Sequence, residues 1–222
     1  MHRRSSSAPQ LWTYAPYAAV VSLHVILLAL QSPAAGPTKL LLMPALAIPV
    51  LASMRSAKPL SAVLLLLGAI VLSWLGDGAG TFFPAAPELP LMLTFFGLAH
   101  LAYIAVFIRF LGRGRMPWWA LTYAVWWVAM IAVVGPHAGS LFVAVAIYGL
   151  VLGSTAAFAA RCGPIVAVGG AFFLASDTLL ALRLFLPDSL PAWSSPTIML
   201  TYAVGQGLIV AGALMTLRRR TA

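Results

Sequence analysis

The chain alternates between long apolar runs and short polar breaks. Eight runs occupy about residues 14–30, 38–52, 60–76, 91–111, 118–134, 140–160, 165–186 and 197–217. Most approach the ~20 residues that a helix needs to cross a bilayer. Their apolar residues are continuous and do not alternate with polar ones, and backbone groups in lipid must be paired within the segment. The pattern therefore predicts an all-α fold, a polytopic transmembrane bundle of about eight helices.

The breaks define the domain organisation. Residues 14–217 form one predicted transmembrane domain, between polar tails at 1–13 and 218–222. Pro44 and Pro49 lie inside the second run and predict a kink there, because neighbouring helices can satisfy the backbone groups that a proline frees. The single cysteine, Cys162, permits no intrachain disulfide.

Basic residues recur in every second break, which bears on orientation. Arg and Lys precede the first run, follow the second, fourth and sixth, and close the chain, whereas the intervening breaks hold the acids Glu88 and Asp188. Cytoplasmic loops of membrane proteins carry the excess of Lys and Arg. We therefore expect a multi-pass protein of the cell membrane with both termini in the cytoplasm. The same distribution attributes the net charge of +9 to topology, so nucleic acid is not an expected partner.

Composition makes the acidic residues conspicuous. The chain is 62% hydrophobic and 8% charged, with only four acids. Two of the acids, Asp77 and Asp177, lie at the end of or inside apolar runs. An ionised carboxylate in hydrocarbon is costly, so such a residue is a functional-site hypothesis by default. The alternative is a neutral acid that is hydrogen-bonded to a neighbouring helix.

Depth along the predicted helices brings further polar residues to the same level. At about 1.5 Å per residue, Asp77 and Asp177 lie about 27 and 20 Å from the cytoplasmic side. His100, Tyr202 and Gln206 fall in the middle or outer half, and Lys39 lies near the outer start of the second run. Tyr202 and Gln206 share a helix face, as residues i and i+4 do. Interhelical hydrogen bonding is the alternative for both residues, and snorkelling to the interface is the alternative for Lys39.

His100 belongs to a stripe with Phe96, Tyr103 and Phe107, which lie on one helix face at spacings of four, three and four residues. A packing face that contains a hydrogen-bonded histidine is the alternative to a functional role. One clear histidine near the acids does not favour a zinc site, which usually has three protein ligands. We expect neither a metal nor another cofactor.

Four stretches in order, SWLGDGAG, FFGLAHLAYIAVF, GAFFLASDTLLALRLF and TYAVGQGLI, resemble the YhhN-like membrane proteins, the lysoplasmalogenase family. The resemblance extends from about Lys39 to Ile209. It implies that Asp77 and Asp177 correspond to the proposed catalytic pair of the family. The family's His-x-x-Tyr falls on His100 and Tyr103, and its Tyr-x-x-x-Gln falls on Tyr202 and Gln206.

The chain departs from the family pattern in two places. The family carries Lys-Pro or Lys-x-x-Pro well upstream of its first aspartate, and Lys39, followed by Pro44, has the better distance but a looser pattern than Lys58-Pro59. Small residues, Gly78, Ala79 and Gly80, follow Asp77 where the family has bulky apolar ones. The predicted substrate-binding residues are Lys39, His100, Tyr103, Ser176, Tyr202 and Gln206.

The resemblance implies hydrolysis of the vinyl ether bond of a lysoplasmalogen to a fatty aldehyde and a glycerophospho-alcohol. A carboxylic acid can protonate the outer alkene carbon, and a carboxylate can stabilise the resulting cation or activate water. Asp177, among Phe172, Phe173 and Leu174, is the expected acid. Asp77, beside glycines that water can reach, is the expected base. The expected partners are thus a lysophospholipid substrate and membrane lipids. Two alternatives are a lipid or small-molecule transporter or receptor, with the aspartates as proton-relay groups, and a metal-dependent hydrolase of another lipid.

Overall fold

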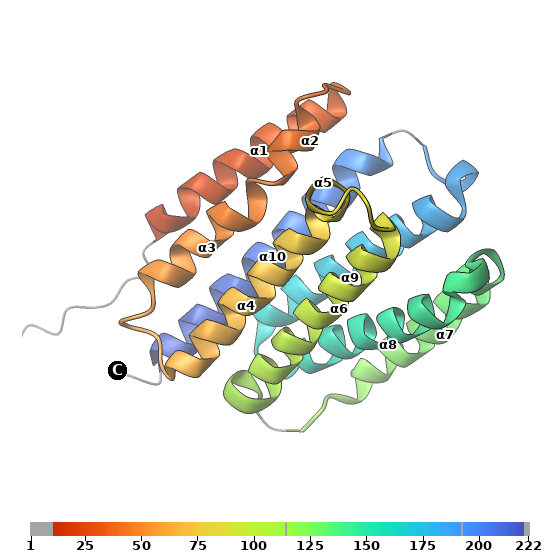
Figure 1. Cartoon of the computed structure of the whole chain (residues 1–222). Coiled ribbons are helices and arrows are strands. Elements are labelled where there is room, and N and C mark those ends of the chain that lie inside the picture. The colour runs from red at the N-terminus through yellow and green to blue at the C-terminus, as the bar shows by residue number, and fades with distance from the viewer. Residues whose placement is uncertain (1–10, 114, 192, 220–222) are drawn as a thin grey trace, which may run out of the picture.

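The computed structural model describes residues 11–113, 115–191 and 193–219, and within these ranges the secondary structure is helical (Figure 1). Eight segments are long and apolar enough to cross a membrane. Their ends agree with the eight predicted runs to within three residues. The prediction of an all-α, multi-pass membrane bundle is therefore confirmed. The predicted tails fall largely on residues 1–10 and 220–222, which lie outside the described ranges.

The long helices are connected by short turns. The long elements are α1 (Ala15–Ala29), α3 (Leu42–Ala52), α4 (Leu60–Asp77), α6 (Glu88–Val106), α7 (Thr122–Val134), α8 (Phe142–Ala159), α9 (Pro164–Phe185) and α10 (Ser194–Arg219). Two short helices, α2 (Ala35–Lys39) and α5 (Ala79–Phe82), precede α3 and follow α4, and a π-helical turn at Phe107–Leu111 extends α6. Brief 3-10 turns flank several of the spans, among them Leu11–Tyr14, Trp118–Leu121, Gly135–His137, Gly139–Leu141 and Pro187–Ser189.

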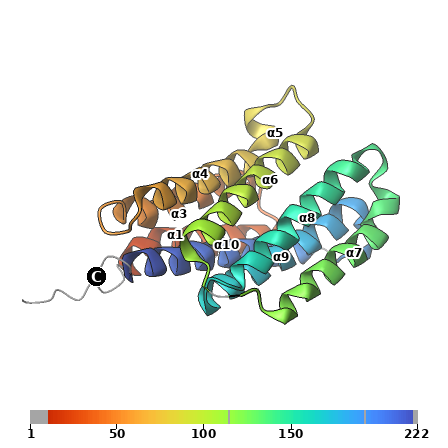
Figure 2. The same cartoon turned by 90° about the horizontal axis from the view of Figure 1, so that it is seen from below.

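Helix α10 lies at the centre of the bundle. It has the largest buried share of the eight spans, packs most extensively against α9, and also contacts α1 and α3. Figure 2 shows α7 at one edge beside α8, with α1 and α3 at the other edge. Helices α4 and α6 pack against each other, and α6 also contacts α8. Segments far apart in sequence thus meet around α9 and α10.

The connections that contain basic residues gather at one end of the bundle (Figure 1). This basic end holds Arg55, Lys58, Arg113, Arg115, Arg161, Arg218 and Arg219. At this end the backbone N–H of Arg113 donates to Arg161 O at 3.0 Å. The remaining connections lie at the opposite end, which we call the far end. The cytoplasmic placement of the basic end stays a prediction, based on the distribution of positive charge.

The second span breaks before Pro44. Helix α2 ends at Lys39 and α3 begins at Leu42, while Pro49 lies inside α3. Pro44 has no N–H to donate to the carbonyl of Leu40, and its ring would clash with that carbonyl in a regular helix. The indole Nε1–H of Trp74, on α4, donates to Leu40 O at 2.9 Å instead. The kink predicted from the prolines thus occurs at Leu40, and it ties the end of α2 to α4.

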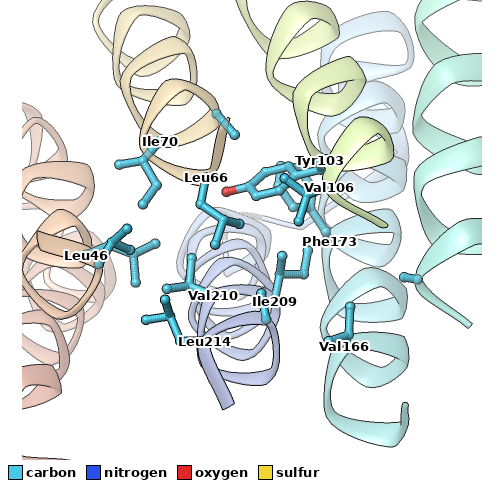
Figure 3. Close-up of a cluster of buried hydrophobic side chains, with 14 of the residues drawn as sticks. Leu46, Leu66, Ile70, Tyr103, Val106, Val166, Phe173, Ile209, Val210 and Leu214 are labelled. Carbon is cyan, nitrogen blue, oxygen red and sulfur yellow. The ribbon is translucent and has the colours of Figure 1, made fainter. Parts of the chain in front are cut away.

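An apolar core fills the half of the bundle nearer the basic end. Figure 3 shows Leu46, Leu66 and Ile70 facing Val210 and Leu214 across this core, between α3, α4 and α10. Helices α9 and α10 approach closely through glycines: a Cβ added at Gly205 would lie 2.7 Å from the backbone N of Phe173. Such small residues allow membrane helices to pack backbone to backbone. The tight contact fixes α9 against α10 and so positions the polar side chains that both helices carry further toward the far end.

Candidate active site

A cavity of about 120 Å³ lies in the half of the bundle nearer the far end. Both intramembrane aspartates, Asp77 and Asp177, line it. Its other polar lining residues are Lys39, Tyr148, Ser176 and Tyr202. Most of the remaining wall is apolar and comes from α6, α8, α9 and α10, for example Met92, Leu180, Leu184, Phe185 and Met199. Residues from six spans therefore enclose one space that has a few polar groups and a largely apolar surface.

Asp77 sits at the last residue of α4 and is held by a cation and a hydroxyl. The ammonium Nζ of Lys39 lies 3.2 Å from Asp77 Oδ1. The hydroxyl of Tyr202 donates to Asp77 Oδ2 at 2.8 Å. The Asp77 side chain is 3% exposed and that of Lys39 is 32% exposed. Charge-assisted contacts to both oxygens favour the carboxylate form of Asp77, whereas the burial of the side chain opposes it.

Asp177 has different neighbours. The hydroxyl of Tyr148 on α8 donates to Asp177 Oδ2, and Nε2 of His100 lies 3.9 Å from the same oxygen. In the described part of the chain, no Lys or Arg lies within ion-pair distance of Asp177. The two carboxyl groups thus share one cavity but not one electrostatic environment.

Burial does not separate the two aspartates in the way that the sequence predicted. We expected Asp77 to be the more accessible to water because glycines follow it. Its side chain is instead the less exposed of the two, at 3% against 9% for Asp177. The reason is close packing: the ring of Phe82 covers Gly78, and a Cβ on Gly76 would lie 2.7 Å from the ring of Phe96. The small residues admit aromatic rings here, and the expectation of an open Asp77 is wrong.

A buried hydrogen-bond network supports the wall beneath Asp77. Gln206 Nε2 donates to Ser73 Oγ at 3.0 Å and lies 3.5 Å from the hydroxyl of Tyr202. The hydroxyl of Tyr103 donates to Gln206 Oε1. Gln206 and Tyr103 are fully buried and are not among the cavity-lining residues. This network orients Tyr202, whose hydroxyl reaches Asp77.

His100 lies behind the cavity wall. It is fully buried, packs against Phe173 with ring centroids 4.6 Å apart, and faces Tyr148 edge-on. In the described part of the chain, neither ring nitrogen has a hydrogen-bond partner. Ser176 does line the cavity, and its hydroxyl donates to Ile198 O at 3.0 Å. Of the six predicted substrate-binding residues, the structure brings Lys39, Ser176 and Tyr202 to the cavity and leaves the other three behind it; direct substrate contact stays a prediction for all six.

Tyr148 is the site residue that the sequence analysis missed. It lies in the middle of an apolar stretch, AIYGL, and no motif marks it. The feature that could have revealed Tyr148 is its depth in the membrane. Tyr148 lies six residues into α8 from the far end, which is the level that we had assigned to the other polar groups.

The single cysteine, Cys162, lies between α8 and α9, outside the spans. Burial raises the pKa of the Cys162 thiol to about 12, so this group is a thiol at neutral pH.

Fold and site together define a polytopic helical membrane protein in which two aspartates from different spans line one cavity. The sequence matches the model of the YhhN family over residues 34–213. The chain therefore belongs to the YhhN family, as its motifs indicated. No curated protein and no solved structure matched the chain. The matched region includes both aspartates, Lys39, Tyr148 and Tyr202.

Proposed function

We propose that this protein is a membrane-embedded hydrolase that cleaves the vinyl ether bond of a lysoplasmalogen to a fatty aldehyde and a glycerophospho-alcohol. The observation that carries the proposal is the pair of unlike aspartates in one cavity. Asp77 is contacted by the ammonium of Lys39 at 3.2 Å, whereas Asp177 is contacted by the hydroxyl of Tyr148. General acid–base chemistry at one pH needs one protonated and one ionised group, and these surroundings favour such a division.

Asp177 is the proposed acid. In the proposed mechanism its acidic proton is on Oδ1, the oxygen that Tyr148 does not contact. Asp177 transfers this proton to the outer alkene carbon of the vinyl ether, and the electron pair of the double bond forms the new C–H bond. The product is an oxocarbenium ion, with positive charge shared between the inner carbon and the ether oxygen. The carboxylate of Asp77 stabilises that cation, as the second carboxylate of glycosidases does.

Water then completes the hydrolysis. Asp77 takes a proton from a water molecule as its oxygen attacks the oxocarbenium carbon, which gives a hemiacetal. The hemiacetal collapses when Asp177, now a carboxylate, removes the hydroxyl proton and Asp77 returns its proton to the departing glycerol oxygen. Both aspartates end in their starting states, and one water molecule has been consumed per aldehyde released.

The apolar surface of the cavity supports a lipid substrate. Its apolar wall includes Leu89, Leu93, Leu184 and Phe185, near the far end of α6 and α9. Such an apolar surface is suited to contact with a single hydrocarbon chain. We also propose that the basic end faces the cytoplasm, which would place the cavity in the outer half of the membrane.

The experiment is a direct assay of purified protein with a lysoplasmalogen, with the aldehyde and the glycerophospho-alcohol both measured. Asp77→Asn and Asp177→Asn should each abolish turnover while the protein still inserts and folds. The matched substrate control is the saturated alkyl ether analogue, which has no alkene to protonate and should not be cleaved. Binding or transport of the lipid without release of aldehyde would replace the proposal with the transporter alternative.

Reaction in heavy water tests the protonation step by itself. Transfer of a solvent-derived proton to carbon places one deuterium on the second carbon of the aldehyde and slows the reaction. The control is authentic aldehyde held with the enzyme in heavy water, which measures later exchange. Aldehyde that is formed without deuterium at this carbon would rule out protonation of the alkene.

A further inference from the structure

Two basic residues depart from the charge distribution of the rest of the chain. Among the described residues, eight lie at or near the basic end: Arg55, Lys58, Arg109, Arg113, Arg115, Arg161, Arg218 and Arg219. Only Lys39 and Arg183, in the described ranges, lie toward the far end. A basic residue on the side that the positive-inside bias leaves poor in Lys and Arg requires its own explanation. Lys39 has one, because its ammonium contacts Asp77.

Arg183 lies in the last turn of α9 and contacts two hydroxyls at the start of α10. Its Nη1 donates to Ser194 Oγ at 3.1 Å and also to Ser195 Oγ. Ser194 is buried, with 2% of its surface exposed, whereas Arg183 is exposed. No carboxylate of the described residues pairs with Arg183. Among the described residues, the contacts of the guanidinium are thus with neutral hydroxyl groups.

The cluster of Arg183, Ser194 and Ser195 adjoins residues that line the cavity, although none of the three is itself a lining residue. Ala181 and Leu184, on either side of Arg183 in sequence, line the cavity, and so does Ile198, one turn beyond Ser194. Arg183 is six residues beyond Asp177 along α9, which corresponds to a rise of about 9 Å. In a lysophospholipid, six covalent bonds separate the vinyl ether carbon from the phosphorus, about 7 Å when extended. The rise along α9 is therefore similar to the distance from the reacting carbon to the phosphorus, while the six-residue step turns Arg183 about 120° around the helix from Asp177.

We propose that Arg183, Ser194 and Ser195 bind the phosphate of the lysophospholipid head group, a role that rests on the proposed function. A guanidinium presents a planar fork of donors that fits two phosphate oxygens. Each serine hydroxyl that accepts from Arg183 also carries a proton that it can donate to a third oxygen. Binding the phosphate here places the alkene beside Asp177 and makes the phosphate, rather than the hydrocarbon chain alone, a determinant of specificity.

The competing explanation is structural: Arg183 would only fasten the connection between α9 and α10, through the two serines or through Asp188, whose side chain lies outside the described part. The test compares two substrates with the same alkenyl chain, a choline lysoplasmalogen and the corresponding 1-alkenylglycerol without phosphate. Arg183→Gln should lower the ratio of kcat/KM for the phosphate-bearing to the phosphate-free lipid by about 10- to 100-fold, the usual range for lost contacts to a charged group. Arg183→Lys should keep part of this preference.

Two controls isolate the head-group effect. Arg55→Gln removes an exposed cation from the basic end and should leave the substrate ratio unchanged. Asp188→Asn removes the nearest acid in sequence, and it should not weaken the preference for phosphate. A loss of activity in Arg183→Gln that is equal for both substrates, or that Asp188→Asn reproduces, would overturn the phosphate site in favour of the structural explanation.

A binding experiment separates failure of this proposal from failure of the proposed function. The probes are the non-cleavable 1-alkyl lysophospholipid and the matching 1-alkylglycerol, with affinity measured by native mass spectrometry. Tighter binding of the phosphate-bearing probe that Arg183→Gln removes would support the site even if no aldehyde were ever released. Equal affinities of wild type and Arg183→Gln for the phosphate-bearing probe would overturn it, whatever the outcome of the hydrolysis assay.

Discussion

Replacing Lys39 by Met tests whether the cation is what makes Asp77 the base. The substitution keeps the length and apolar stem of the side chain and removes the charge that lies 3.2 Å from Asp77 Oδ1. At that separation, Coulomb's law with an effective dielectric constant of about 20 gives about 5 kcal/mol. Because Lys39 is 32% exposed, screening by water reduces this energy, and we take about 2–3 kcal/mol for the loss. Since about 1.4 kcal/mol is a factor of ten in rate, kcat/KM should fall about 30- to 150-fold.

The assay is aldehyde release from a lysoplasmalogen by purified variants, combined with thermal unfolding in detergent. Lys39→Arg is the matched control, because it retains a positive charge and should keep more activity than Lys39→Met. Unfolding adds a test that does not depend on turnover. Lys39→Met leaves a buried carboxylate without its cation, which is more destabilising than the removal of both charges. Adding Asp77→Asn to Lys39→Met should therefore recover part of the lost melting temperature.

Two results would refute this reasoning. If Lys39→Met keeps near wild-type turnover while Asp77→Asn is inactive, Asp77 works without its cation. Strict additivity of the two substitutions in the unfolding measurement would mean that the Lys39–Asp77 contact carries no coupling energy, since double-mutant cycles report such coupling as non-additivity. The first outcome would also remove the basis for assigning different roles to the two aspartates.

Three further predictions follow from other contacts. Tyr148→Phe removes the hydroxyl that donates to Asp177 Oδ2 and should lower kcat about 10-fold or more; unchanged turnover would show that the contact does not matter. Gly205→Val should destabilise the bundle by about 1–3 kcal/mol through overpacking, whereas Gly68→Ala, where an added Cβ meets nothing within 4 Å, should not, as melting temperatures will show. Cys162, with its thiol pKa raised to about 12 by burial, should react slowly with maleimide at pH 8 until the protein is denatured; rapid labelling of the folded protein would contradict this.

The number and ends of the spans could be predicted because the bilayer imposes a length and a composition. A run of about 20 apolar residues has few alternatives to a helix, and the eight runs became eight helical spans. What the pattern could not give was the precise point at which the second span breaks. Two prolines lie in that run, and each leaves one backbone carbonyl without its usual helical N–H donor. The position of the break depends on which of these carbonyls accepts a hydrogen bond from another group. Trp74, 34 residues away on another helix, supplies that donor to Leu40 O.

The site was predictable as a level in the membrane but not as a set of facing side chains. Counting residues from the connections placed Lys39, Asp77, Asp177 and Tyr202 at compatible depths, and the structure brings these four to one cavity. Depth does not fix the rotation of a helix about its axis. Gln206 shares a face with Tyr202, yet it lies one turn deeper and bonds to Ser73 behind the wall.

The difference between the two aspartates follows from their partners and not from their burial. The sequence suggested that water would reach Asp77 and not Asp177, and would thereby keep the first ionised. Both side chains are in fact nearly excluded from solvent, at 3% and 9% exposure, so desolvation acts on both. What differs is charge: an ammonium lies beside Asp77, and a neutral hydroxyl lies beside Asp177. In the proposed mechanism, the ion pair with Lys39 favours the ionised form of Asp77 without requiring water, so the cavity can exclude solvent from the reacting cation while Asp77 remains a carboxylate. The proposal therefore gives Lys39 the function that we had first assigned to solvent.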